Sequence, residues 1–204
     1  SNTTSRGAQS ATIISEGSRF PLNQYLNPEA RHVLESLLEI WGIEGGNATT
    51  LVDQLIDWTD ADNATTGQGK ERGYYFSAGI PGYPFNRPFE ALDELTLVAD
   101  YPLLAQVKPD WRSVFTLKSS GKLDVNTASA DLIAAVCECS LSTAEHFVQT
   151  RSGSDGIPLT IDDLEMETVE EALDLLMTYG TDRERVAPRF TTDDPVKRIV
   201  ATGT

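Results

Sequence analysis

The sequence is poor in the residues on which enzymes most often rely. Its 204 residues include two histidines, two cysteines and two methionines. His32 and His146 each lie among apolar residues in a helical pattern, which favours a surface or edge position over the role of a catalytic base. There is no Gly-x-Ser-x-Gly turn and no glycine-rich phosphate loop, and paired carboxylates are too frequent among 31 acidic residues to indicate a hydrolase. We therefore expect a protein without enzymatic activity.

Basic residues are also scarce. Sixteen lysines and arginines face 31 aspartates and glutamates, which leaves a formal net charge of −15 that is spread over both halves of the chain. A field of this sign repels phosphate backbones, and no basic stripe reverses it locally. Nucleic acid and an anionic membrane surface are therefore poor candidates for a partner.

Long hydrophobic runs are missing as well. No stretch approaches the roughly 20 apolar residues that cross a bilayer. Residues 1–10 lack the charged start and the apolar middle of a signal peptide, and the chain begins with Ser1 rather than Met. We therefore expect an excised soluble part of a longer protein, whose membrane segment, if it has one, lies upstream.

The two cysteines, Cys137 and Cys139, are separated by one residue. On a continuous helix, positions i and i+2 point about 200° apart, so a disulfide between them would be strained. The simplest interpretation is that both are small, half-buried packing residues. A metal site that also uses His146 is the alternative, but it lacks a fourth obvious ligand and the usual spacing.

Strand-like alternation is confined to the two ends of the chain, and helical periodicity fills the middle. Helices are predicted over residues 28–41, 49–58, 92–97, 101–107, 131–136 and 142–151, and a further acidic amphipathic helix is predicted to begin at Thr160 and to include 162–174. Terminal strands are predicted at 186–190 and 196–201. This order predicts an α+β fold, with helices inserted between the strands of one small antiparallel sheet formed by residues 9–22 and 184–203.

Two segments, residues 37–56 and 131–151, each read as two helices joined by a tight turn. The second resembles the helix-hairpin-helix family, whose DNA-binding members aim glycine N–H groups at a phosphate. Here Glu138 places an acid in that turn, so a DNA role is disfavoured and the unit is interpreted as a packing scaffold. We expect two separate lobes of one helical domain. The side chains expected in their cores are Trp41 and Trp58 in the first, and Leu132, Val136, Phe147 and Val148 in the second.

Four carboxylates gather at the predicted end of the second helix and in the loop that follows. Asp57, Asp60, Asp62 and Glu71 partly match a calcium-binding loop, but Ala64 occupies a ligand position, so the segment is not an EF-hand. Such carboxylates repel one another unless they are solvated or hold a hard cation, and the flexible oxygen coordination of calcium suits them. The chemistry alone leaves two interpretations open, a solvated acidic loop and a calcium site.

Five short motifs occur in a characteristic order. They are Leu51-Val-Asp-Gln-Leu-Ile-Asp57-Trp58-Thr-Asp60-Ala-Asp62, Gly69-Lys-Glu71-Arg-Gly-Tyr74-Tyr75, Asn86-Arg87-Pro88, Leu92-Asp-Glu94-Leu95-Thr-Leu-Val98 and Asp124-Val-Asn126-Thr-Ala128. As an ordered set, spanning about residues 19–151, they resemble the minor pseudopilin K family of the type II (general) secretion pathway.

This resemblance implies a pilin-like fold, in which a small antiparallel sheet accepts a large helical insertion with two helix-hairpin-helix or SAM-like units. The implied division of the chain is 1–27 for N-terminal strands, 28–118 for the first helical unit with its long loop, 119–180 for the second unit and 181–204 for C-terminal strands. Some members bind calcium in the helical domain, which implies calcium ligands at Asp57, Asp60, Asp62 and Glu71.

The resemblance also implies a place in the cell. The protein would be the periplasmic domain of a protein anchored in the inner membrane of a Gram-negative bacterium by a hydrophobic helix upstream of this sequence. It would cap the tip of the pseudopilus, in contact with other minor pseudopilins, and support protein export. The alternative is a helix-hairpin-helix adaptor that binds other proteins without pilus assembly.

Overall fold

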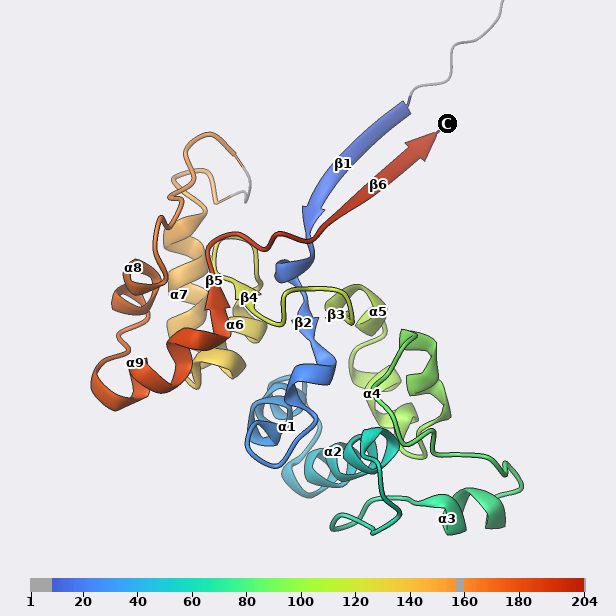
Figure 1. Cartoon of the computed structure of the whole chain (residues 1–204). Helices are drawn as coiled ribbons and strands as arrows, with labels where there is room; N and C mark the ends of the chain where they lie inside the picture. Colours follow the sequence, from blue (N-terminus) through green and yellow to red (C-terminus); the bar gives the residue numbers. More distant parts are fainter. Residues whose placement is uncertain (1–8, 157–159, 204) are drawn as a thin grey trace, which may run out of the picture.

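A computed structural model describes residues 9–156 and 160–203, which form a helical body with a two-stranded ribbon projecting from it (Figure 1). The ribbon pairs β1 (Gln9–Ser15) with β6 (Lys197–Gly203) in antiparallel register, with Ile13 opposite Ile199. The first and last described strands of the chain therefore lie side by side, and the described helices and strands between them belong to the body. The predicted order of strand, helices and strand is confirmed at this level.

The expectation of a single antiparallel sheet is wrong beyond this ribbon. Two further pairs of strands are separate and parallel: β2 (Phe20–Pro21) pairs with β3 (Phe115–Thr116), and β4 (Leu123–Asp124) pairs with β5 (Phe190–Thr191). β1 cannot continue into β2 because a tight 3-10 turn, η1 (Glu16–Ser18), separates them. A Cβ on Gly17 in that turn would lie 2.6 Å from the Cβ of Asp194, so only glycine fits there.

The first helical pair consists of α1 (Arg31–Ile40) and α2 (Gly45–Thr59). The Asn27 side chain accepts a hydrogen bond from the Ala30 N–H at 3.0 Å, so the predicted capping asparagine organises the turn before the helix. α1 ends where Gly42 adopts a φ of +98°, a conformation that favours glycine. The apolar stripe read from the sequence is buried, which confirms the predicted inward face.

The second pair, α6 (Ala130–Cys137) and α7 (Leu141–Arg151), packs on the first rather than forming a lobe of its own. α1 contacts α6, and one continuous hydrophobic core includes residues of both pairs. The Trp41 indole is half-buried at this junction and donates to the Asp131 carboxylate at 2.7 Å. The expectation of separate lobes is therefore wrong, because the second face of α1 is covered by α6. Trp58, Leu132, Val136 and Phe147 are buried as predicted, and Val148 is half-buried.

The remaining helices are short. They are α3 (Arg72–Ser77), α4 (Tyr101–Val107), α5 (Trp111–Val114), α8 (Val169–Leu175) and α9 (Gly180–Val186), with 3-10 turns η2 (Leu22–Tyr25), η3 (Leu92–Leu97) and η4 (Ala187–Arg189). In the part of the chain that the structure describes, no helix combines the length and the apolar character needed to cross a bilayer.

The acidic segment differs from its prediction. The helix expected from Thr160 begins at Val169, because a capping box forms there: the Thr168 hydroxyl accepts from the Glu171 N–H, and Glu171 accepts from the Thr168 N–H. The predicted strand at 186–190 is also largely helical, since α9 and η4 occupy residues 180–189. The range 181–204 therefore begins with a helix and not with strands.

An aromatic cluster at the end of α2 closes the core of the first helical pair. Trp58 is fully buried and its ring contacts those of Tyr75, Tyr83, Phe85 and Phe89. Three of these four rings come from the segment between α3 and η3, so the cluster attaches that segment to α2. Trp58 thus connects a regular helix to a stretch with little regular structure.

We expect the substitution Trp58→Ala to lower the free energy of unfolding by about 3–5 kcal/mol, because it removes a large buried ring and leaves a cavity. For a chain of this length, that corresponds to a fall in melting temperature of roughly 6–20 °C in a thermal unfolding experiment. Phe76→Ala is the matched control: Phe76 is 71% exposed, so its truncation should leave the melting temperature nearly unchanged. Equal melting temperatures for Trp58→Ala and the unsubstituted chain would contradict this packing.

Candidate metal centre

The candidate site is built on the side of α2 that faces the loop at residues 60–71. Asp53 and Asp57 lie one helical turn apart on this side, and both are buried. The carboxylate of Asp53 accepts from the Arg31 guanidinium at 2.6 Å and from the Gln68 N–H at 2.8 Å. Its charge is therefore compensated, and it anchors the loop to the helix.

Asp57 anchors the same loop but is only half satisfied. Its Oδ1 accepts from the Thr66 N–H at 2.9 Å, whereas its Oδ2 is buried without a hydrogen-bond partner. The loop passes so closely that a Cβ on Gly69 would lie 2.0 Å from this Oδ2. Only a glycine at position 69 therefore allows the returning chain, which carries Glu71, to pass alongside Asp57.

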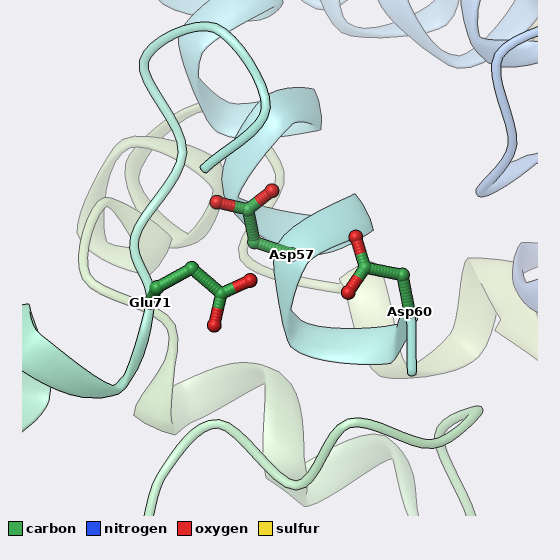
Figure 2. Close-up of side chains that lie close together, drawn as sticks. All are labelled: Asp57, Asp60 and Glu71. Carbon is green, nitrogen blue, oxygen red and sulfur yellow. The ribbon is translucent and has the colours of Figure 1, made fainter. Parts of the chain in front are cut away.

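Three carboxylates meet where the loop returns. Asp57, Asp60 and Glu71 each offer an oxygen, and these oxygens all lie within 4.8 Å of one another. Figure 2 shows them converging from three places: Asp57 on the last turns of α2, Asp60 just past its C-terminal end and Glu71 on the returning loop. Among the described residues, no salt bridge reaches any of the three.

The electrostatics of this group are unfavourable without a cation. Oδ2 of Asp57, Oδ1 of Asp60 and both carboxylate oxygens of Glu71 are buried and lack a partner. Burial, followed by the charges of Asp57 and Asp60, raises the pKa of Glu71 from 4.5 to about 7. Burial is also the main cause that raises the pKa values of Asp57 and Asp60. Both sit at the C-terminal end of α2, where the helix dipole adds to the cost of a negative charge.

The structure brings together three of the four predicted ligands. Asp62 is exposed, and its Oδ1 accepts from the Ala64 N–H at 2.7 Å, so it lies outside the converging group. Its negative charge nevertheless contributes to raising the pKa values of the other three. Asp60 and Asp62 are separated by a single residue in the sequence. Only Asp60 belongs to the converging group, because the chain turns away from α2 after Asp60.

Two positions that shape the site were not assigned to it from the sequence. They are Asp53 and Asn86. Asp53 carries a readable signal, since it precedes Asp57 by one helical turn. Asn86 donates to the backbone carbonyl of Asp62, and its own Oδ1 is buried without a partner. This contact joins residues 62 and 86, which are too far apart in the sequence for their proximity to be predicted from local patterns.

A second acidic group differs in kind. Asp155, Asp162 and Asp163 also place oxygens within 4.8 Å of one another, but they are exposed or half-buried. The Asp162 carboxylate accepts from the backbone N–H and hydroxyl of Ser154, and these hydrogen bonds lower its pKa. Protein donors therefore already stabilise its charge, in contrast to the orphaned oxygens of Glu71.

The raised pKa of Glu71 predicts how the stability of the metal-free chain depends on pH. In the folded chain Glu71 keeps its proton up to about pH 7, whereas in the unfolded chain it releases it near 4.5. The folded state thus holds the extra proton in this range, so the free energy of unfolding should fall as the pH rises from about 4.5 to about 7.

Thermal unfolding in the presence of EGTA between pH 5 and pH 8 measures this dependence. Glu71→Gln should flatten the fall, because the amide does not titrate, and should raise stability at pH 8. Glu29→Gln, at an exposed position, should keep the slope of the unsubstituted chain. Parallel pH profiles for all three proteins would contradict the assignment of the titration to Glu71.

Comparisons with known proteins agree with the resemblance seen in the sequence. The family model for protein K of the type II secretion system (T2SS) matches residues 18–109. Type II secretion system protein K of Pseudomonas aeruginosa is 32% identical over 148 residues, which cover 68% of this chain and 42% of that protein. The match therefore covers less than half the length of this relative.

A solved structure has the same fold over the whole chain. It is a chain in the crystal structure of the GspK-GspI-GspJ complex from the type 2 secretion system of enterotoxigenic Escherichia coli. The match has a TM-score of 0.73 at 18% identity and covers 100% of this chain and 72% of the other. The sequence matches, over residues 18–109 to the family model and over 148 residues to the Pseudomonas aeruginosa protein, lead to one conclusion: this chain belongs to the protein K family of type II secretion systems.

Proposed function

We propose that the protein acts as a non-enzymatic minor pseudopilin that caps the tip of a periplasmic pseudopilus and so supports protein export. The observation that carries this proposal is the full-length match in fold to a chain from a complex named for GspK, GspI and GspJ. Other minor pseudopilins of the same secretion system are accordingly the expected partners. A hydrophobic helix upstream of this sequence would anchor the protein in the inner membrane before assembly.

The projecting ribbon supports an assembly role. A two-stranded antiparallel ribbon is marginally stable by itself in water and needs further strands or a helix against it. Here Ile13 and Ile199 face each other across β1 and β6 and are 69% and 70% exposed. In the proposed pilin-like domain, this ribbon is the part of the sheet that neighbouring elements cover. The pairs α1–α2 and α6–α7 would be the two helix-hairpin-helix or SAM-like units of the insertion.

Reconstitution tests the assembly. The soluble domain should co-elute in size-exclusion chromatography with the soluble domains of the I and J minor pseudopilins from the same secretion system, as one complex that contains all three. In the parent bacterium, deletion of the gene should reduce the export of secreted proteins, and the full-length gene should restore it. Separate elution of the three domains, together with undiminished export after deletion, would overturn the proposal.

We also propose that the site at the end of α2 binds calcium. Buried, partnerless oxygens on Asp57, Asp60 and Glu71 fit a hard cation, which needs several oxygen ligands and tolerates the irregular geometry of a loop. Asp62 lies next to the site and would add negative charge or bind through water. When bound, the ion would offset the repulsion among the carboxylates and brace the loop at residues 59–90 against α2.

Calorimetry with matched variants tests the calcium site. Asp60→Asn and Glu71→Gln should weaken calcium binding by at least tenfold, whereas Asp62→Asn should retain affinity within a few-fold because Asp62 lies outside the converging group. Millimolar calcium should raise the melting temperature of the unsubstituted chain, EDTA should lower it, and magnesium should do less than calcium. Asp110→Asn, on the surface far along the chain, is the neutral control. The proposal would be overturned if the unsubstituted chain released no heat on calcium titration, or if Asp60→Asn released the same heat. These acids would then be a solvated cluster.

A further inference from the structure

The segment between the candidate metal centre and η3 presents apolar side chains to solvent. Four large side chains in residues 74–85 are 40–71% exposed: Tyr74, Phe76, Ile80 and Phe85. Among the described residues, no other stretch of this length exposes as many large apolar side chains. These four side chains, together with Lys70 and Arg72 beside them, are defined as the α3 surface. Exposed apolar side chains that cluster in this way, unlike scattered ones, mark interaction sites.

The aromatic cluster around Trp58 holds the α3 surface from beneath. Tyr75, in the middle of α3, is fully buried, and its ring centroid lies 5.5 Å from that of Trp58. Phe85 is part of both the cluster and the surface, with its ring centroid 5.6 Å from that of Trp58. At the far end of the segment, the Asn23 side chain exchanges two hydrogen bonds with the backbone of Phe89, at 2.9 and 3.0 Å. Because these contacts already order the segment, binding a partner there costs little additional ordering.

Charge distinguishes the α3 surface from the rest of this acidic chain. Residues 72–89 contain no aspartate or glutamate, which is the longest such run in the sequence. The Lys70 ammonium lies 5.0 Å from the centroid of the Tyr74 ring, in a cation–π contact, and Arg72 is exposed. Within the part of the chain that the structure describes, neither Lys70 nor Arg72 forms a salt bridge. The α3 surface therefore combines apolar side chains with two uncompensated positive charges.

The neighbouring acids do not cancel these two charges. Glu71 lies between the two cations in the sequence, but its side chain is buried and directed into the converging group of the candidate metal centre (Figure 2). Glu90 pairs with Arg87 at 3.7 Å. Asp62 is exposed and borders the segment, because its backbone carbonyl accepts a hydrogen bond from Asn86. The local balance at the surface thus stays positive, and a cation in the proposed calcium site would offset the buried acids as well.

The α3 surface lies far from the ribbon. β1 and β6 project from one end of the body, and α3 lies at the opposite end (Figure 1). In the proposed pilin-like assembly, neighbouring elements cover the ribbon, so the α3 surface would face away from them. This step rests on the proposed function, and it indicates a partner other than the pseudopilins that pack at the ribbon.

We propose that the α3 surface binds a segment of another protein in which carboxylates lie next to apolar side chains. The apolar side chains of the partner would pack on Phe76 and Ile80, and its carboxylates would pair with Lys70 and Arg72. Aromatic residues and arginine are enriched at the centres of protein interfaces. A short segment meets mainly the local charge, because salt screens charges more than about 8–10 Å away. An anionic membrane is a broader surface that would also meet the net charge of −15, so a protein segment is the favoured partner.

Amide NMR spectra of the chain, recorded in calcium-containing buffer during titration with a synthetic peptide, test the proposal. The probe is a short peptide rich in glutamate, leucine and phenylalanine, and the control peptide carries lysine in place of glutamate. Shifts should centre on the amides of residues 70–89, and added salt should weaken the binding. The absence of shifts, shifts centred elsewhere, or equal affinity for the control peptide would overturn the proposal. Tighter binding to phosphatidylglycerol vesicles than to the peptide would also overturn it, in favour of a membrane surface.

Matched variants assign the binding to this surface. Arg72→Glu should weaken peptide binding by at least tenfold, because it replaces an attractive charge with a repulsive one, and Phe76→Ala should weaken it by removing an apolar contact. Both side chains are exposed, so neither change should lower the melting temperature. Lys122→Glu and Tyr179→Ala alter an exposed cation and an exposed ring outside the α3 surface, and they should bind the peptide as the unsubstituted chain does. Equal affinity in all of these proteins would contradict the assignment.

Assembly and export separate this inference from the proposed function. The Arg72→Glu domain should still co-elute with the soluble domains of the I and J minor pseudopilins, whereas the full-length gene with this change should restore export less well than the unsubstituted gene. Loss of co-elution would place the α3 surface inside that complex, which would overturn this inference and leave the proposed function intact. Failure of the unsubstituted domain to co-elute would count against the proposed function, while the peptide titration would still decide whether the α3 surface binds.

Discussion

Negative charge buried at the end of α2 is the constraint on which the organisation of the first helical pair depends. The Asp53 carboxylate accepts hydrogen bonds from the Arg31 guanidinium and the Gln68 N–H, which compensate its charge and bind the loop to the helix. No guanidinium reaches Asp57, Asp60 or Glu71, and apart from the Thr66 N–H on Asp57 Oδ1 their buried oxygens lack a partner. The effective cost of an unpaired buried charge is several kcal/mol, whereas an exposed ion pair contributes about 0–1 kcal/mol. The free-energy cost of burying these three carboxylates is therefore larger than the contribution of the surface ion pairs. The loop that carries Glu71 needs a partner that compensates this negative charge.

A second set of buried polar contacts joins the ribbon to the body. Glu16 accepts from Arg19 and Thr116, Ser15 donates to Asp124 at 3.0 Å, and Asp194 accepts from the N–H of Ser120 at 3.0 Å. These contacts lie where β1 and β6 leave the helices, and each joins segments that are distant in the sequence except that between Glu16 and Arg19. The ribbon is thus held at its base, and two pairs further out Ile13 and Ile199 are exposed opposite each other.

Much of this molecule could be predicted from local patterns. The helices α1, α2, α6 and α7 follow from apolar residues at three- and four-residue spacing, because one face of each is buried. Three of the four carboxylates named from the sequence lie close together in the structure, since they occupy a helix end and the returning loop. The order of the motifs was specific enough to indicate the protein K family, to which the chain belongs.

By itself, then, the sequence determined the main helices α1, α2, α6 and α7, which acids lie near the end of α2 and which family the chain resembles. Tertiary structure alone decided the two-residue parallel pairings of β2 with β3 and of β4 with β5, because strands this short carry no periodic signal. It also decided that α6 covers α1, that Asp62 points away from the other carboxylates and that Glu138 turns left-handed between two cysteines. The strand pairings and the packing of α6 on α1 depend on contacts between distant segments, whose energies override the local preferences that a sequence pattern expresses.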